Sequence, residues 1–290
     1  MHVETLQVFC DLVETGSFSS AASQNFITQS AVSQQVRALE ARFDQLLIER
    51  TKGHVQPTPA GQLLYQAGKE ITSRYRDLRE KMQSFGKVVS GSVRLATVHS
   101  VGLYELSEPL RKFLKAYPQV NVHIEYSRAS KIFDDVLSGR IDLGIVAYPS
   151  RRPQIAVIPF REDHLVLVCA PHHPFARRKA VALKELNGQT FVGYERDLPT
   201  RRATDRVLRR KHVAVRYVTE LDNIETIKRV VEIGTGVALL PEPTVKQEVR
   251  SRTLCTVPIS DEPLLRPLGI VHRQGRHFAP AVERFISELK

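Results

Sequence analysis

Apolar residues near the N-terminus recur at three- and four-residue intervals, the spacing of helices with one buried face. The first pattern predicts a helix over residues 2–15, with Leu6, Phe9, Cys10 and Val13 toward a core. A second predicts a short buried helix from Phe18, Ala21, Ala22, Phe26 and Ile27. A third gives another helix one apolar face, formed by Val32, Val36, Leu39 and Phe43. Between the last two, residues 28–30 predict a turn with N-cap character, so the whole indicates a helix-turn-helix.

The polar face of the third helix carries side chains suited to reading base edges in a major groove. They are Gln29, Ser30, Ser33, Gln34 and Arg37. Gly53 then predicts a tight turn between two short extended segments, with three basic residues around it: Arg50, Lys52 and His54. A basic two-stranded wing can approach phosphates or the minor groove. Residues 1–57 are therefore predicted to bind nucleic acid.

At this point the chain resembles the LysR-type transcriptional regulators. The resemblance rests on Leu6, Phe9, Val13, the run from Gly16 to Ser19, Ala21-Ala22, the run from Gln29 to Val36, Leu39-Glu40, Glu49-Arg50 and the run from Thr58 to Gly61. Two positions depart from the family pattern: Ser30 stands where Pro is usual, and Phe43-Asp44 where Leu-Gly is usual. Neither departure removes a turn or an apolar face, although Ser30 could alter base preference. The resemblance implies promoter DNA as a partner, with RNA polymerase as a further candidate.

A longer amphipathic pattern follows the wing. Thr58-Pro59 predicts a helix start, with Thr as cap and Pro in the first turn. The apolar stripe of this helix comprises Leu64, Ala67, Ile71, Tyr75, Leu78, Met82 and Phe85. The stripe can form a coiled-coil seam or pack on its own domain. We favour the seam, because the helix precedes any second core that could receive it. The resemblance adds that this linker, residues 58–89, forms a dimer that commonly assembles into a tetramer.

Beyond a joint at Ser90-Gly91-Ser92, strand and helix patterns alternate, which implies a parallel sheet with helices on both sides. Strands are predicted at 93–98, 120–126, 142–147, 157–160, 165–170, 190–193, 215–220, 237–240 and 268–272. Helices are predicted at 102–116, 131–138, 200–212, 224–233 and 280–289. We expect two small α/β units, residues 91–162 with 268–290 and residues 163–267. The family's effector-binding domain has this shape and resembles periplasmic solute-binding proteins.

Three predicted strand ends in this region carry groups that suit an anionic ligand. Ligands of open α/β sheets bind beyond the carboxyl ends of strands, near helix N-termini. The candidates are His99, Ser100, Ser127, Arg128, Ser130, Thr200, Arg201 and Arg202. Hydroxyls can hold an anion and a guanidinium fork suits carboxylate or phosphate. Each Ser or Thr alone is more often a helix cap, so the expectation of a small anionic effector depends on their convergence.

The charge distribution qualifies this interpretation. The formal net charge is +11, yet residues 1–90 contribute only +1 of it. DNA binding is therefore inferred from local pattern and not from overall charge. Residues 196–216 hold eight basic and two acidic residues, which suits a solvated helix face, an anion-binding cleft or contact with wrapped DNA.

Composition limits the other classes. The hydrophobic content of 42% is ordinary, and no run approaches the ~18 apolar residues of a membrane helix. We expect a cytoplasmic protein without a signal peptide. Cys10, Cys169 and Cys255 are an odd number without a C-x-x-C pair, which favours buried thiols over a redox sensor. Without enzymatic or metal-site motifs, we expect neither catalysis, cofactor nor metal. The alternative is a solute-binding module whose N-terminal unit only mediates association.

Overall fold

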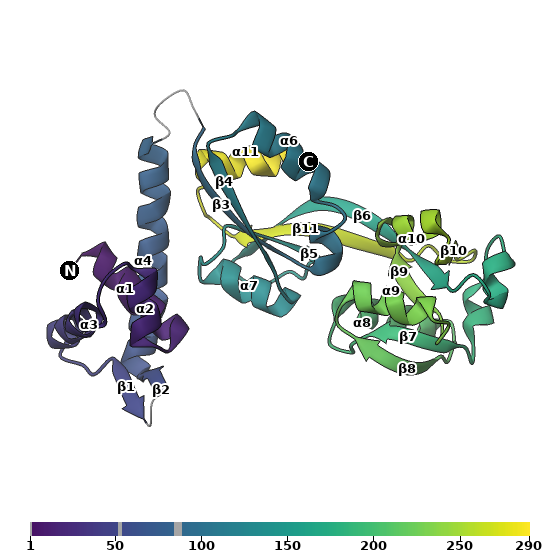
Figure 1. Ribbon diagram of the computed structural model, residues 1–290, viewed down its shortest axis with the longest axis horizontal. Coiled ribbons are helices and arrows are strands. Elements are labelled where there is room, and N and C mark those ends of the chain that lie inside the picture. The colour runs from purple at the N-terminus through teal and green to yellow at the C-terminus, as the bar shows by residue number, and fades with distance from the viewer. Residues whose placement is uncertain (1, 52–53, 84–88) are drawn as a thin grey trace.

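The computed structural model of the chain describes residues 2–51, 54–83 and 89–290. An N-terminal head and two α/β lobes lie in a row, and helix α4 (Pro59–Gln83) stands between the head and the nearer lobe (Figure 1). We call residues 89–160 with 268–290 the near lobe, and residues 165–264 the far lobe. Two long strands, β6 (Ile155–Cys169) and β11 (Leu265–Arg273), run between the lobes (Figure 1).

The head contains the predicted helix-turn-helix. Its helices are α1 (Val3–Thr15), α2 (Phe18–Gln24) and α3 (Gln29–Phe43), followed by an antiparallel wing of β1 (Ile48–Thr51) and β2 (His54–Pro57). Val8, Leu12, Val32 and Val36 are among the residues of its core. The prediction of Phe26 inside a buried helix was wrong, because α2 ends at Gln24 and the side chain of Phe26 is 96% exposed. Phe43 was also predicted to be buried and is 43% exposed.

Short-range contacts explain why these residues form these elements. Thr28 is the N-cap of α3, and its hydroxyl accepts a hydrogen bond from the Ala31 amide. A Glu40 carboxylate oxygen accepts from the Leu47 and Ile48 amides, which fixes the start of the wing. The predicted Thr58 cap is confirmed, since its hydroxyl accepts from the Gly61 amide. A Cβ at Gly61 would lie 1.9 Å from the Leu47 carbonyl oxygen, so only glycine allows this approach.

Helix α4 has two different faces. One packs on α1, where the Lys69 ammonium lies 2.5 Å from the Glu14 carboxylate. The other leaves much of the apolar stripe exposed, including Leu78 at 56% and Met82 at 63%. The stripe is therefore not covered by the chain's own domain, and it remains available to a second copy. Phe85 lies outside the described residues.

The near lobe is a mixed sheet covered by helices. Its parallel strands are β4 (Val120–Tyr126), β3 (Gly91–Thr97) and β5 (Leu143–Ala147), in that spatial order, and β11 and β6 continue the sheet antiparallel. Its helices are α5 (His99–Gly102), α6 (Ser107–Ala116), α7 (Ala129–Leu137) and α11 (Pro280–Leu289). Phe113 and Phe285 are fully buried and pack edge to face at 4.9 Å in its core.

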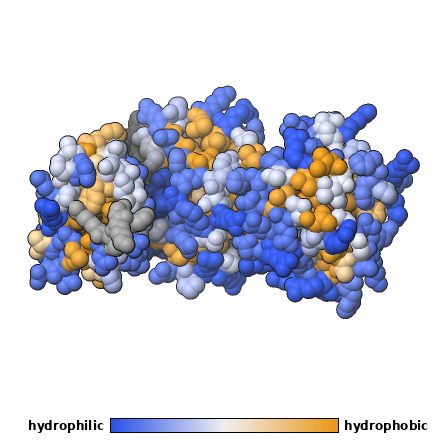
Figure 2. Space-filling model, turned by 60° about the horizontal axis from the view of Figure 1, so that its bottom comes forward, coloured by the Kyte–Doolittle hydropathy of each residue, from blue (hydrophilic) through white to orange (hydrophobic). Residues whose placement is uncertain are grey.

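The far lobe receives the ends of β6 and β11. The second half of β6 pairs with β9 (Ala238–Pro241) and β10 (Cys255–Val257), and β7 (Thr190–Tyr194) pairs parallel with β8 (Arg216–Leu221). Its helices are α8 (Pro199–Arg210), α9 (Ile224–Glu232) and α10 (Lys246–Ser251), with short 3-10 turns η1 (Pro174–Arg177), η2 (Leu183–Leu186) and η3 (Glu242–Val245). Viewed from another side, a mostly hydrophilic surface carries hydrophobic patches over the head and the far lobe (Figure 2).

Three expectations about the lobes were wrong. The helix predicted at 102–116 is two helices, because Pro109 lacks an N–H and is suited only to the first turn of α6. The strands predicted at 157–160 and 165–170 are one strand, β6, whose charged segment 161–164 pairs with β11 instead of turning. The sheet is not wholly parallel, because β11 runs antiparallel to both of its neighbours, β5 and β6.

Candidate nucleic-acid interface and interlobe cleft

The predicted reading face of α3 is accessible. Gln29, Ser30, Gln34 and Arg37 are exposed, and Ser33 is half-buried. The Ser30 hydroxyl lies 2.9 Å from the Thr28 hydroxyl, which holds it at the first turn of the helix. On the opposite side, Val32 and Val36 are buried in the head. Polar groups along the first turns of an exposed second helix are the arrangement by which such helices reach base edges.

The wing of β1 and β2 follows this helix in the chain and carries two of the predicted basic positions, Arg50 and His54. In the backbone register of the wing Arg50 pairs with Val55 and Thr51 pairs with His54. Lys52 lies outside the described residues. The predicted phosphate or minor-groove contacts of Arg50, Lys52 and His54 therefore remain a prediction.

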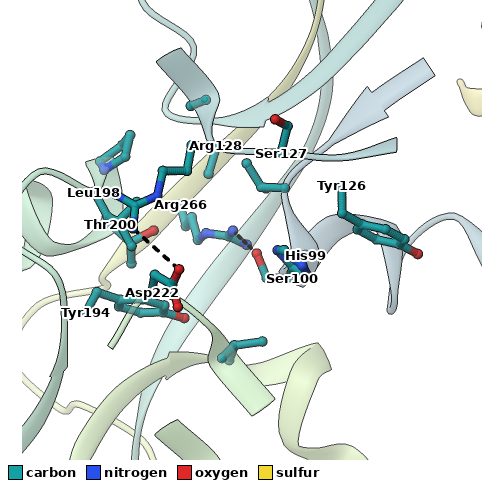
Figure 3. Close-up of a pocket in the computed structure, with 15 residues that line it drawn as sticks. His99, Ser100, Tyr126, Ser127, Arg128, Tyr194, Leu198, Thr200, Asp222 and Arg266 are labelled. Carbon is teal, nitrogen blue, oxygen red and sulfur yellow. Dashed lines mark hydrogen bonds and ion pairs between the residues drawn. The ribbon is translucent and has the colours of Figure 1, made fainter. Parts of the chain in front are cut away.

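Between the lobes is a cleft of about 260 Å³ that collects most of the predicted effector residues. Those lining it are His99, Ser100, Ser127, Arg128 and Thr200. The close-up shows them entering from several elements around a common space, with Arg266 and Tyr194 among them (Figure 3). The His99 ring stacks on Tyr126 with centroids 5.1 Å apart, which builds one wall from the near lobe.

The hydroxyls in the cleft are not helix caps. The N-cap residues of α5, α7 and α8 are Val98, Arg128 and Leu198, and none of them makes a side-chain cap hydrogen bond. The Ser100 hydroxyl instead accepts a hydrogen bond of 2.6 Å from the Arg266 guanidinium. Ser100 and Thr200 therefore do not act as helix caps, which was the alternative to ligand binding.

Arg266 is the charged group at the back of the cleft, and the sequence patterns did not single it out. Its side chain is 2% exposed; Nη1 donates to Asp163 at 2.7 Å and Nη2 to Ser100 at 2.6 Å (Figure 3). Its buried Nε has no hydrogen-bond partner among the described residues. Buried guanidinium donors are nearly always satisfied, so an unpaired one beside a cavity indicates room for a further acceptor.

Arg128 closes the mouth of the cleft. From the near lobe its guanidinium reaches three carboxylates of the far lobe: Glu195 at 2.6 Å, Asp197 at 3.1 Å and Asp222 at 3.4 Å. The contact with Asp222 crosses the drawn pocket (Figure 3). These hydrogen bonds, chiefly that with Glu195, raise the pKa of Arg128 above its ordinary value. The predicted anion-binding Arg128 therefore also bridges the lobes.

Arg201, which the sequence placed among the effector residues, is not among the residues that line the cleft. Its side chain is 5% exposed, pairs with Asp205 and Glu220, and donates to the Tyr194 carbonyl at 2.7 Å. Its guanidinium carbon also lies 3.4 Å from the centre of the Tyr217 ring. Arg201 thus anchors α8 to the β7–β8 sheet.

The other two predicted residues lie in a neighbouring hollow. Ser130 and Arg202 line a cavity of about 440 Å³ that also includes Arg128, Arg152 and Arg206. Farther along α8, Arg210 and Lys211 both pair with Glu262. Arg209 and Arg216 donate instead to the Asp205 carbonyl and the Thr190 hydroxyl, so the basic residues of 196–216 divide among this hollow, ion pairs and neutral hydrogen bonds within the lobe.

The far-lobe residues that the sequence reading missed had different signals. Tyr194 is the last residue of β7 and Asp222 follows β8, so the strand-end rule could have found both. Burial raises the pKa of Tyr194, which keeps its phenol protonated. Arg266 had no such signal, because it lies inside a strand that reaches the cleft only by crossing between the lobes.

The remaining features of interest in the described residues are metal-binding groups, membrane helices and cysteines. Among residues 2–51, 54–83 and 89–290, no group of three His, Cys, Asp or Glu side chains is placed to hold a metal ion. Nor does the described part of the chain contain a helix long and apolar enough to cross a membrane. Cys10 and Cys169 are buried as expected; Cys255 is half-buried and lies opposite Cys169 on the paired strands β6 and β10. Burial raises the pKa of the Cys169 thiol to about 11.

Comparison with known proteins identifies the class. Residues 3–62 match the bacterial regulatory helix-turn-helix proteins of the LysR family, and residues 86–290 match the LysR substrate binding domain. The chain therefore belongs to the LysR family of DNA-binding transcriptional regulators, which confirms the winged helix-turn-helix followed by an α/β effector domain.

Individual relatives cover the whole chain. The HTH-type transcriptional regulator CysL of Bacillus subtilis is 25% identical over all of this chain and 97% of its own length. A full-length OxyR variant from Pseudomonas aeruginosa shares the fold, with a TM-score of 0.79 at 21% identity over 100% of this chain and 93% of that one. The CcmR regulatory domain of Synechocystis PCC6803 in complex with 2-PG has a TM-score of 0.64 at 25% identity, over 69% and 96%.

Proposed function

We propose that this chain regulates transcription in response to a small anionic metabolite that binds between its two lobes. The head would read promoter DNA through Gln29, Ser30, Ser33, Gln34 and Arg37, with the wing on the phosphates or in the minor groove. The site of action is the cytoplasm, where promoter DNA is found. Two copies would associate through the exposed stripe of α4.

The observation that carries the anionic effector is the state of Arg266. Its charge is balanced by Asp163, its Nε is buried without a hydrogen-bond partner among the described residues, and its side chain lines the cleft. The hydroxyls of Ser100 and Thr200 border the same space. A planar guanidinium flanked by hydroxyls suits a carboxylate or phosphate group. The 2-PG bound to the CcmR regulatory domain is such an anion, 2-phosphoglycolate.

Arg128 would couple effector binding to a change in the contacts between the lobes. The anion would compete with Glu195, Asp197 and Asp222 for this guanidinium, whose contacts currently hold the lobes together at the mouth. Releasing or replacing those contacts changes the angle between the lobes. A ligand shifts such an equilibrium only through its differential affinity for the two arrangements. The change in lobe angle would then alter the spacing of the two heads in a dimer.

A thermal-shift screen of the full chain tests this proposal, with 2-phosphoglycolate and a panel of carboxylates and sugar phosphates as probes. A ligand at 100 times its Kd should stabilise the protein by ~2.7 kcal/mol. Ser100→Ala and Arg266→Lys should abolish the shift and the DNA response, while basal DNA binding stays intact. Arg202→Ala tests whether the neighbouring hollow contributes.

Arg196→Ala is the matched control, because Arg196 is an exposed arginine of the same region that pairs with Glu220 outside the cleft. It should respond as the unaltered chain does. An equal shift in the Ser100→Ala variant would place the effector elsewhere.

A further inference from the structure

Phe26 has the most exposed large apolar side chain of the residues that the structure describes, at 96%. It lies in the turn between α2 and α3, after the last residue of α2 and two residues before the N-cap of α3. A phenyl ring in water loses the favourable burial that normally places phenylalanine in a core. Packing within the chain therefore does not explain this residue.

The backbone of Phe26 does not favour phenylalanine either. Its φ is +55°, the left-handed region, where bulky residues are rare and Asn or Gly is preferred. The turn imposes this angle, since the Phe26 amide donates to the Ser23 carbonyl and the Ile27 amide to the Ala22 carbonyl. The neighbouring Asn25 side chain is fixed by hydrogen bonds to Asp11 and the Ala21 carbonyl. A rigid turn thus presents the ring outward.

The position of the ring relative to the reading face suggests its partner. Phe26 precedes Gln29 by three residues, a chain length that spans at most roughly 10 Å, or about three base-pair steps. The N-terminal end of a recognition helix enters the major groove. The only apolar feature that a base edge offers there is the thymine C5-methyl group, which phenylalanine side chains contact.

We propose that Phe26 is a further sequence-reading residue, whose ring contacts a thymine methyl beside the bases reached from the first turn of α3. This inference rests on the proposed entry of α3 into the major groove. It adds an apolar contact from the turn to a reading face otherwise made of amides, hydroxyls and a guanidinium.

The test compares the full chain with Phe26→Asn, in selections from a randomised duplex DNA library. Asparagine tolerates the left-handed backbone, so this variant should unfold at the same or a higher temperature than the unaltered chain. Phe43→Asn is the matched control, because Phe43 is an exposed aromatic at the C-terminal end of α3, away from the turn that holds Phe26. Each thymine of the selected duplex is then replaced in turn by deoxyuridine, which removes only the methyl group.

The unaltered chain and the Phe43→Asn variant should bind about fourfold more weakly when one particular thymine per half-site loses its methyl. The Phe26→Asn variant should lose both the preference for that thymine and the sensitivity to its methyl. The inference would be overturned if all three proteins selected the same sequences and responded alike to deoxyuridine. The Phe26 ring would then be assigned to contact with a protein partner. Equal weakening on every sequence would also overturn it, since it indicates backbone contact. Failure of the unaltered chain to enrich any duplex would instead refute the DNA-reading function itself.

Discussion

The reading face of the head and the cleft between the lobes place their functional side chains in opposite ways. The residues of the reading face come from one helix within nine positions, and most are exposed. The cleft draws on residues from Val98 to Arg266, and its arginines are already paired: Arg266 with Asp163, and Arg128 with three carboxylates. The side chains of the reading face are exposed and available to DNA, whereas the arginines of the cleft are already paired with carboxylates of the same chain.

This difference separates binding from stability. Removing an exposed side chain from the head should change affinity for DNA and leave folding intact. Removing one member of an ion pair in the cleft leaves the other charge buried without its partner, which is destabilising. Binding and stability therefore change together. Variants in the two regions can therefore be ranked by how strongly they test this contrast.

The largest expected effect is in the cleft. Asp163→Asn would leave the guanidinium of Arg266 buried without its counter-charge, which should cost about 3–5 kcal/mol of unfolding free energy. Urea unfolding followed by circular dichroism measures it. Arg37→Ala in the head is the comparison variant and should change stability by less than about 0.5 kcal/mol. Equal effects of the two changes would remove the contrast.

A second large effect concerns the exposed stripe of α4. Leu78→Asp would place an unpaired charge in the proposed seam and weaken the dimer by about 3 kcal/mol, or more than about 100-fold. Sedimentation equilibrium measures the change in mass. Arg79→Asp, at the next exposed position, should leave assembly nearly unchanged. The same oligomer for the Leu78→Asp variant and the unaltered chain would refute the seam.

Gln29→Ala tests the head directly. It should relax preference at one base position and cost roughly 1–3 kcal/mol there, without loss of stability. Binding to a set of operator variants that differ at single positions measures it. Unchanged affinity for every variant would remove Gln29 from the reading face.

Neutralising the wing should have a smaller, sequence-independent effect. Lys52→Gln should weaken binding to all duplexes alike and lower the slope of log affinity against log salt by about one. A salt titration with selected and random duplexes measures it. A loss confined to the selected duplex would instead assign Lys52 to base reading.

The smallest expected effect is a change in how stability depends on pH. Burial alone would raise the pKa of Asp142, but the guanidiniums of Arg94 and Arg276 outweigh it and hold that pKa below the usual 3.8. The ionised carboxylate therefore contributes stability above about pH 4, and this contribution is lost as the pH falls through the lowered pKa. Asp142→Asn should reduce stability at neutral pH and flatten its decline in acid, measured by urea unfolding at several pH values. A decline in acid as steep as that of the unaltered chain would assign it to other carboxylates.

Much of the head was predictable because its signals are local. Helical periodicity placed α1, α3 and α4, and the Thr28 and Thr58 caps marked two helix starts that the structure confirms. Apolar spacing failed where a turn interrupted the helix. Phe26 continued an apolar spacing, yet the turn after α2 places it in solvent.

In the lobes, the sequence by itself determined the alternation of strands and helices and three strand ends rich in hydroxyls and arginines. The tertiary structure decided which of those residues face a common space. It directed Arg201 into the β7–β8 sheet, set Arg128 across the cleft, and brought Arg266 to Ser100 from 166 positions away. Periodicity and caps depend on neighbours within a few residues, whereas the pairing of a buried charge depends on strands that meet only when the chain is folded.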